Sequence, residues 1–311
     1  DEEEYYLFVG IDLLIADGGS VRIFIRQLLD FYYDRFDKNR QNAFTFKDYV
    51  EALNDFSESS TYKEDKDYWM EQISLIPPAP MLPLQKDPSV IRKPQFARIE
   101  KVIPKSEWNV LQKEAKKKGI TTSTLLCTAY ALVLGYWSNQ PELTINVTVF
   151  TRYPFNEGVT DIVGDFTSVI LLRVNLLGRS DFWKLASEIQ NQLMDALEHR
   201  HYDGMNVIRK IAEQAEMKEQ AVMPVVFTSL LFSMEEGDIV TIEDLGEVKM
   251  GVSQTSQVYL DYQVMETKEG LLITWDYIKE LFTPNMISTM FKQYINIVES
   301  LSKNVISMPH L

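Results

Sequence analysis

The stretch "GIDLLIADGGS", residues 10–20, sets two carboxylates, Asp12 and Asp17, in an apolar run that ends in two glycines and a serine. Buried segments seldom carry a carboxylate unless it is paired, because transferring an isolated charge out of water is costly. The two acids therefore need either partners or a chemical role.

The hydrophobic period changes across this stretch. Apolar residues alternate over residues 5–14, which is typical of a strand covered on both faces, and recur at helical spacing over residues 21–32. Ser20 suits the N-cap of that helix. We therefore expect a strand, a tight glycine turn and a helix, with Asp12 near the end of the strand and Asp17 in the turn.

Composition excludes several classes of protein. The 311 residues are 45% apolar and 24% charged, as in ordinary globular proteins, and the net charge of -14 argues against a nucleic-acid partner. The longest apolar run, residues 122–137, is shorter than the roughly 20 residues that span a bilayer, so we expect no membrane segment. The single cysteine, Cys127, fits a core thiol in a reducing cytoplasm, and the three histidines have no metal-ligand spacing.

Beyond the first helix, two polar or proline-rich stretches separate the chain into parts. Residues 57–67 are polar and charged and are expected to be exposed, and residues 75–88 hold prolines that favour an extended crossing. Alternation of strands and helices follows, which indicates an α/β class. We expect strands at 96–103, 143–150, 168–174, 225–232, 258–265 and 271–275, and helices at 106–119, 121–137, 182–199, 205–214 and from Thr283-Pro284 onward.

Five motifs occur in a fixed order and resemble those of one family. They are "DLLIADGGS" (12–20, of the form DxxxxDxxS), "IPPAPMLPLQKDP" (76–88), "GDFTSVILL" (164–172), "PVVFTSLL" (224–231) and "SQTSQVYLD" (253–261), with thirteen residues between Asp261 and Trp275-Asp276. Together they resemble the heterocyclization domains of nonribosomal peptide synthetases, in which DxxxxDxxS replaces a double-histidine motif. One difference is Ser256, where the family pattern has proline.

The resemblance implies an α/β fold like that of chloramphenicol acetyltransferase, with two lobes and mixed sheets. Family members carry more than a hundred residues before DxxxxDxxS, so we expect the N-terminal lobe to be largely missing from this chain. On this basis residues 1–74 are the remnant of that lobe, 75–92 the interlobe connection, and 93–311 the C-terminal lobe.

The resemblance also implies the reaction and the partners. Upstream and downstream peptidyl carrier domains, next to an adenylation domain, would present thioesters on 4'-phosphopantetheine arms; the domain itself would bind no cofactor or metal. Amide formation with a Cys, Ser or Thr thioester would be followed by ring closure and loss of water, giving thiazoline or oxazoline.

Candidate site residues follow from the motifs. Asp261 is the expected general acid and base, because it ends a strand that reads as buried and burial raises a carboxyl pKa. Thr228 is implied to act with it in cyclodehydration, although a Thr in a strand commonly bonds a backbone carbonyl instead. We assign supporting or active-site roles to Asp12, Asp17, Ser20, Gln257, Ser229, Asn146 and Arg152.

Some of these supporting residues have specific expected partners. Arg152 is expected to pair bidentately with Asp17, and Gln257 to orient either the substrate amide or Asp261. Trp275 and Asp276 are expected mainly to pack and to end their strand. Two alternatives remain open, namely a condensation domain that forms only the amide and a non-catalytic lobe that docks carrier domains.

Overall fold

The computed structural model describes residues 5–35, 43–178, 180–216, 221–231 and 244–303. Contacts divide the chain into two compact units: the first comprises residues 1–58, 150–167 and 234–248, and the second comprises 59–149, 168–233 and 249–311. The division into lobes at residues 74 and 92 stays a prediction; by contacts, residues 59–74 group with the second unit.

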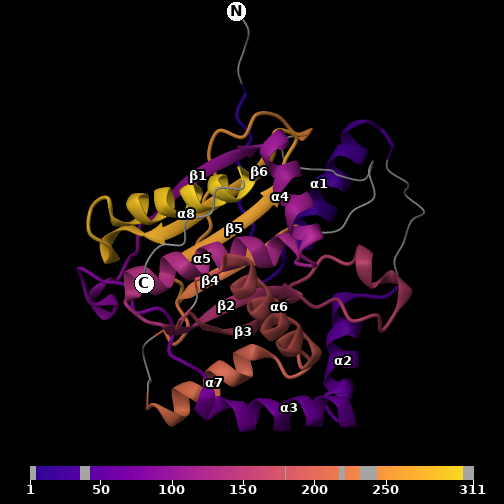
Figure 1. Cartoon of the computed structure of the whole chain (residues 1–311). Helices are drawn as coiled ribbons and strands as arrows, with labels where there is room; N and C mark the ends of the chain where they lie inside the picture. The colour runs from indigo at the N-terminus through magenta and orange to yellow at the C-terminus, as the bar shows by residue number, and fades with distance from the viewer. Residues whose placement is uncertain (1–4, 36–42, 179, 217–220, 232–243, 304–311) are drawn as a thin grey trace, which may run out of the picture. The chain divides into compact units, whose positions relative to one another are not determined.

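The second unit is built on one six-stranded mixed sheet, in the order β1-β6-β5-β4-β2-β3 (Figure 1). Neighbours β1 and β6, and β6 and β5, run antiparallel, whereas β5 and β4, and β4 and β2, run parallel. The mixed α/β class expected from the sequence is confirmed. The strands are β1 (Phe96–Pro104), β2 (Glu142–Phe150), β3 (Thr167–Asn175), β4 (Val225–Ser229), β5 (Leu260–Glu266) and β6 (Gly270–Ile278).

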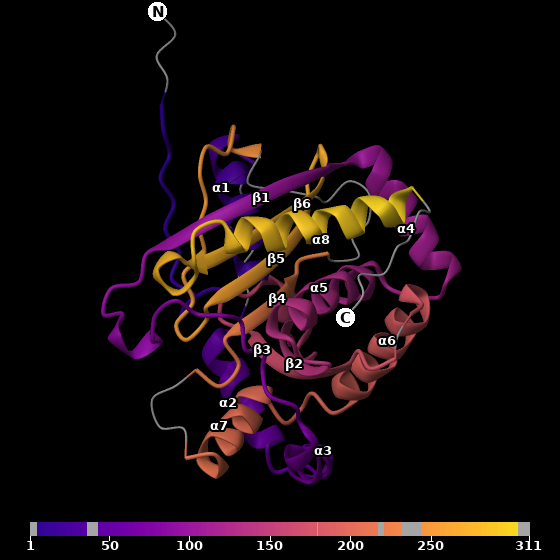
Figure 2. The same cartoon turned by 60° about the vertical axis from the view of Figure 1, so that its left-hand side comes forward.

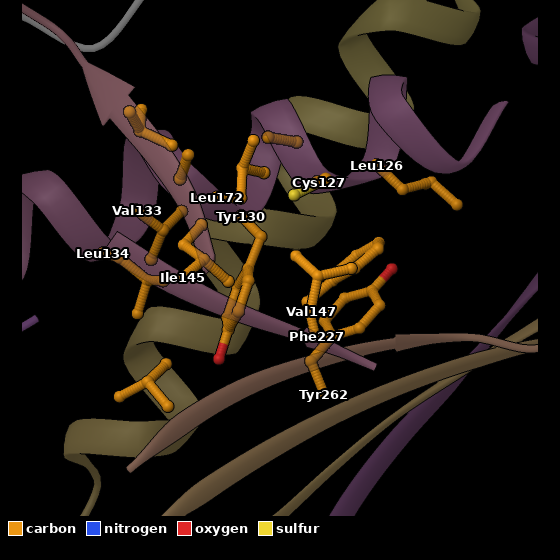
Figure 3. Packing of buried hydrophobic residues seen from close by; sticks show 14 of the residues in the cluster. Leu126, Cys127, Tyr130, Val133, Leu134, Ile145, Val147, Leu172, Phe227 and Tyr262 are labelled. Atoms are coloured by element: carbon orange, nitrogen blue, oxygen red, sulfur yellow. The ribbon is translucent and has the colours of Figure 1, made fainter. Parts of the chain in front are cut away.

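Helices α5 (Thr122–Ser138) and α8 (Met286–Ser302) pack on the apolar face of this sheet (Figures 1 and 2). Tyr130 of α5 lies 5.0 Å, between ring centroids, from Tyr262 of β5, and Figure 3 shows both among aliphatic side chains. The Tyr262 hydroxyl is 2.6 Å from that of Tyr294 on α8, so two buried phenols satisfy each other. Cys127 is buried in the same core, which raises its pKa to about 12 and confirms a packing role.

The remaining helices mostly match their sequence patterns. Lys116 and Lys117 form the last turn of α4, as expected for cations at a helix C-terminus. Among the described residues no single helix could span a membrane, although α4 and α5, bent by 98°, together pass the test of length and composition. The other helices of this unit are α3 (Ser60–Gln72), α4 (Lys105–Lys117), α6 (Phe182–Glu198) and α7 (Gly204–Gln214), with 3-10 turns at Ile73–Leu75, Pro88–Val90 and Lys279–Leu281.

One expectation for this unit holds in part and another is wrong. Residues 57–67 are mostly exposed, as expected, but residues 60–67 belong to helix α3, which Ser59 caps and whose buried Asp65 accepts hydrogen bonds from the His201 backbone and ring at 2.9 and 2.8 Å. Helix α8 begins at Met286, not at Pro284, since Asn285 adopts a left-handed N-cap conformation. Of the strand expected at 225–232, β4 covers 225–229, and residue 232 lies outside the described residues.

The first unit contains α1 (Gly18–Tyr32), α2 (Phe46–Phe56) and a 3-10 turn (Glu157–Asp161), and a small core forms between Tyr49 of α2 and Val159, Ile162 and Phe166. Phe166 stacks edge-on against Tyr49 there, with ring centroids 4.7 Å apart. A Cβ at Gly164 would lie 2.2 Å from the Phe46 ring, which explains the glycine in the "GDF" motif.

The strand expected over residues 5–14 is absent from the described part of this unit. Tyr5, Leu7 and Phe8 are 83%, 69% and 87% exposed, and residues 13–15 form a turn. The alternation of apolar residues gives an extended segment two different faces, but a strand also needs a neighbouring strand for its backbone hydrogen bonds.

Candidate active site

The first unit holds Asp17, which is fully buried and caps the N-terminus of α1. Its Oδ1 accepts hydrogen bonds from the Ser20 backbone and hydroxyl at 2.7 and 2.6 Å. Ser20 is therefore the third residue of the helix and not its N-cap, because the helix begins earlier than the apolar period indicates. Arg152 completes the site from the segment after β2, and its Nη2 lies 2.9 Å from Asp17 Oδ1.

The expected Asp17–Arg152 pair is thus present, but it is not bidentate. Arg152 Nη2 divides its contacts between Asp17 and the Ser20 hydroxyl (3.1 Å), and its Nη1 donates to the carbonyls of Val159 and Ile162 at 3.1 and 2.8 Å. The Ser20 hydroxyl also donates a hydrogen bond to the Gly164 carbonyl and accepts one from the Gly164 N–H. Arg152 therefore connects the loop that carries Val159 and Ile162 to the start of α1, and its pair with Asp17 is part of this structural network.

Asp12 lies outside that network. It is exposed, and its Oδ1 accepts a 3.0 Å hydrogen bond from the backbone of Leu14, which is an Asx turn. The structure therefore places Asp12 at the start of a turn rather than at the end of a strand.

The second unit carries Asn146, Thr228 and Asp261 on one face of its sheet. Strand register aligns two adjacent rows on this face, which are mostly polar: Asn146, Val226, Asp261, Asp276 and Arg98 in one row, and Thr148, Thr228, Gln263, Thr274 and Glu100 in the next. The intervening row, Val147, Phe227, Tyr262, Trp275 and Ile99, points to the helices and is wholly apolar. We call the first two rows the polar face.

Asp261 is the most perturbed acid on the polar face. Its pKa is raised from 3.8 to about 7, mainly by burial and also by the nearby charge of Asp276, while hydrogen bonds from Gln263 and Ser253 and the Arg98 charge oppose the rise only in part. Gln263 Nε2 donates to Asp261 Oδ2 at 2.7 Å, while Oδ1 is buried without a hydrogen-bond partner among the described residues. A carboxyl with a pKa near 7 can both accept and donate a proton at neutral pH.

Thr228 lies on the neighbouring strand directly opposite Gln263, in the row of the polar face next to that of Asp261. Its hydroxyl donates to the Thr148 hydroxyl at 2.8 Å, not to a backbone carbonyl as in the simple structural alternative. Ser229 points to the other side, where its hydroxyl is 2.6 Å from that of Ser123 on α5. Thr228 therefore belongs with Asp261, and Ser229 does not.

Asn146 and Gln257 occupy different environments. Asn146 is buried on the polar face, and its Nδ2 makes a long 3.5 Å contact with the Met223 carbonyl. Gln257 is exposed in a turn with φ of 61°, a left-handed conformation that is uncommon for a residue other than glycine. The side chain that bonds Asp261 is Gln263 and not Gln257, and the alternative role of Gln257, orienting the substrate amide, stays a prediction.

Asp276 also differs from its expected role. It lies inside β6 rather than at its end, and its side chain is fully buried against Arg98. Arg98 Nε and Nη2 donate to its two carboxylate oxygens at 2.9 and 2.6 Å. Sequence reasoning missed Gln263, Arg98 and this pairing. The available signal was the polar alternation of "ARIEK" and "LDYQV", which places these side chains opposite an apolar face.

Comparison with known proteins defines the class. Residues 1–307 match the family model of the condensation domain, so the chain belongs to the condensation-domain family. Solved structures of nonribosomal peptide synthetases are among its structural neighbours, and the chain spans only 6% to 21% of the length of the curated relatives it matches.

Three similar proteins illustrate the relationship. Bacitracin synthase 1 of Bacillus licheniformis is 40% identical over 298 residues, which are 96% of this chain and 6% of that protein. Phenyloxazoline synthase MbtB of Mycobacterium tuberculosis is 31% identical over 94% of this chain and 21% of its own length. The cyclization-docking bidomain of EpoB from Sorangium cellulosum superposes with a TM-score of 0.87 at 32% identity, covering 94% of this chain and 59% of that one.

Proposed function

We propose that this domain catalyses heterocyclization. It would form the amide between a carrier-bound acyl or peptidyl group and a carrier-bound Cys, Ser or Thr, and then cyclodehydrate that amide to a thiazoline or oxazoline. The relatives named for phenyloxazoline synthesis and for cyclization support this assignment. The observation that carries it is Asp261, a carboxyl with a pKa near 7 beside Thr228 on the polar face.

The second stage requires proton transfer at two moments. The β-thiol or hydroxyl adds to the amide carbonyl carbon, forming a carbon–sulfur or carbon–oxygen bond and releasing its proton. The former carbonyl oxygen then leaves as water, taking up that proton and the amide N–H proton as the C=N bond forms. In our proposal Asp261 accepts the first proton and returns it to the departing oxygen.

Thr228 and Gln263 would assist from fixed positions. The Thr228 hydroxyl can both donate and accept, so it suits the oxygen whose charge changes during the reaction. Gln263 holds one carboxylate oxygen of Asp261 and leaves the other for substrate. Neither residue needs a bound cofactor; the phosphopantetheine arms would belong to the partner carrier domains, next to an adenylation domain in the cytoplasm.

Product mass tests the proposal. The protein that carries this chain is mixed with an acyl-carrier thioester and a cysteinyl-carrier thioester, and the released product is weighed by mass spectrometry. We expect the amide minus one water. The intact amide would instead support simple condensation, and the absence of both products would support a carrier-docking lobe.

A further inference from the structure

The Arg98–Asp276 pair joins the edge strand β1 to its neighbour β6 on the polar face. The two residues are direct register partners, and both donor atoms of the arginine engage both oxygens of the carboxylate. The Asp276 side chain is 0% exposed and that of Arg98 is 19% exposed. Such bidentate geometry fixes both side chains, unlike an ordinary surface ion pair.

The same pair holds the segment before β5, residues 249–257, which we call the β5 loop. The Ser253 backbone donates to Asp276 Oδ2 at 3.0 Å. A Cβ at Gly251 would lie 2.9 Å from Arg98 Nη1, so a larger residue there would push the guanidinium out of its present position. The loop ends in the turn from Thr255 to Val258 that presents Gln257.

The pair also shapes the electrostatics around Asp261. Asp276 is the register partner of Asp261 across β5 and β6, and Arg98, on the other side of Asp276, interacts electrostatically with both carboxyls. The groups that face Asp261 are Gln263 on its own strand, Asp276 on β6, Arg98 on β1 and the Ser253 hydroxyl of the β5 loop; Tyr130 of α5 interacts with it electrostatically.

We infer that Arg98 and Asp276 form a positioning pair that fixes the β5 loop and sets the proton affinity of Asp261. The inference deepens the proposed function, since a pair with this role would control cyclodehydration rather than amide formation. Neither residue is assigned to touch the reacting atoms. The pair affects the reaction only indirectly, through Asp261 and through the position of the β5 loop.

Two charge variants separate this role from simple packing. Asp276→Asn removes the like charge beside Asp261 and leaves Arg98 unneutralised, so the pKa of Asp261 should fall by about one unit. Arg98→Gln removes the positive charge and leaves Asp276 unpaired, so the same pKa should rise. If the pair only contributed to packing, there would be no reason for the two variants to shift the pKa of Asp261 in opposite directions.

The measurement is the pH titration of the Asp261 carboxyl carbon by NMR in the full chain, with Glu100→Gln as matched control. Glu100 is an exposed acid on the same strand and is not bonded to Asp276, so its removal should leave the titration nearly unchanged. Arg98→Lys retains the charge, and its shift should be smaller than that of Arg98→Gln. Equal or same-direction shifts in the Asp276 and Arg98 variants would overturn the inference.

Hydrogen exchange gives a second readout that does not depend on activity. The Ser253 amide should exchange at least tenfold faster in Arg98→Gln and in Gly251→Ala, and at the wild-type rate in Glu100→Gln. An unchanged exchange rate of the Ser253 amide in both Arg98→Gln and Gly251→Ala would contradict the inference that the pair fixes the β5 loop. If wild-type protein forms no ring while these shifts are seen, the proposed function fails and the positioning pair stands.

Discussion

Gln263 Nε2 donates a 2.7 Å hydrogen bond to Asp261 Oδ2 from two residues along the same strand. Because both side chains lie on the polar face, the amide fixes one carboxylate oxygen while the other points away from it. This pair, and not the motif glutamine Gln257, defines the orientation of the proposed acid and base.

Replacement of Gln263 should therefore impair ring closure selectively. In Gln263→Leu the carboxylate loses a hydrogen bond worth about 1.5–3 kcal/mol, so cyclodehydration should slow about tenfold to a hundredfold while amide formation continues. Single-turnover mass spectrometry of both products measures the two rates. Gln254→Leu, an exposed glutamine in the β5 loop, is the control and should behave as wild type; equal slowing of both stages in folded Gln263→Leu would contradict the assignment.

The raised pKa of Asp261 also makes stability depend on pH. The carboxyl is ionised above pH 4 in the unfolded chain but only above about pH 7 in the folded one, so folding stability falls as pH rises between these values. From pH 5 to 8 the loss is on the order of 3 kcal/mol. Urea unfolding should show this loss in wild type and its absence in Asp261→Asn; parallel pH curves for the two proteins would refute it.

Thr228 offers a test with a partner residue as control. Thr228→Val keeps the shape but removes the hydroxyl, so cyclodehydration should fall at least tenfold while the free energy of unfolding changes by about 1 kcal/mol. Thr228→Ser should restore most of the rate. Thr148→Val removes the same hydrogen bond by deleting its acceptor and should remain active. If cyclodehydration slowed equally in both valine variants, the lost hydrogen bond would explain the effect and the proposed role of the Thr228 hydroxyl would be contradicted.

The Asp17–Arg152 pair should contribute to stability far more than a surface pair does. Arg152→Met leaves the fully buried Asp17 carboxylate without its charge partner and should cost about 3–5 kcal/mol in the free energy of unfolding. Arg26→Met breaks the exposed pair with Asp161 in the same unit and should cost less than about 1 kcal/mol. Chemical denaturation compares them, and similar losses would contradict a structural role for Asp17.

Local patterns predicted most of the regular structure of the second unit. The strands and helices from Phe96 onward fall close to their expected bounds, because each buries one face and has the matching period. Helix α3 was not predictable in this way, since its sequence is polar and its burial depends on His199 and His201, more than 130 residues away. The prediction of a strand over residues 5–14 was wrong because an alternating sequence does not by itself supply a neighbouring strand to pair with.

The candidate site was predictable only in part. Asp261 and Thr228 came from motifs, and their burial on the polar face fits the roles proposed for them. Arg98 and Asp276 are 178 residues apart, so nothing short of the strand register shows that they are opposite each other. The same holds for Gln263, whose place opposite Thr228 depends on the pairing of β4 with β5.

The central claim is that Asp261 transfers protons in the ring-closing stage, and the product mixture of Asp261→Asn tests it most directly. With acyl and cysteinyl thioesters on their carriers, the account predicts that this variant releases the uncyclised amide, heavier than the ring product by one water, at a rate within a few fold of the wild-type amide step. Loss of both stages together in a folded variant, or normal ring formation, would contradict the claim.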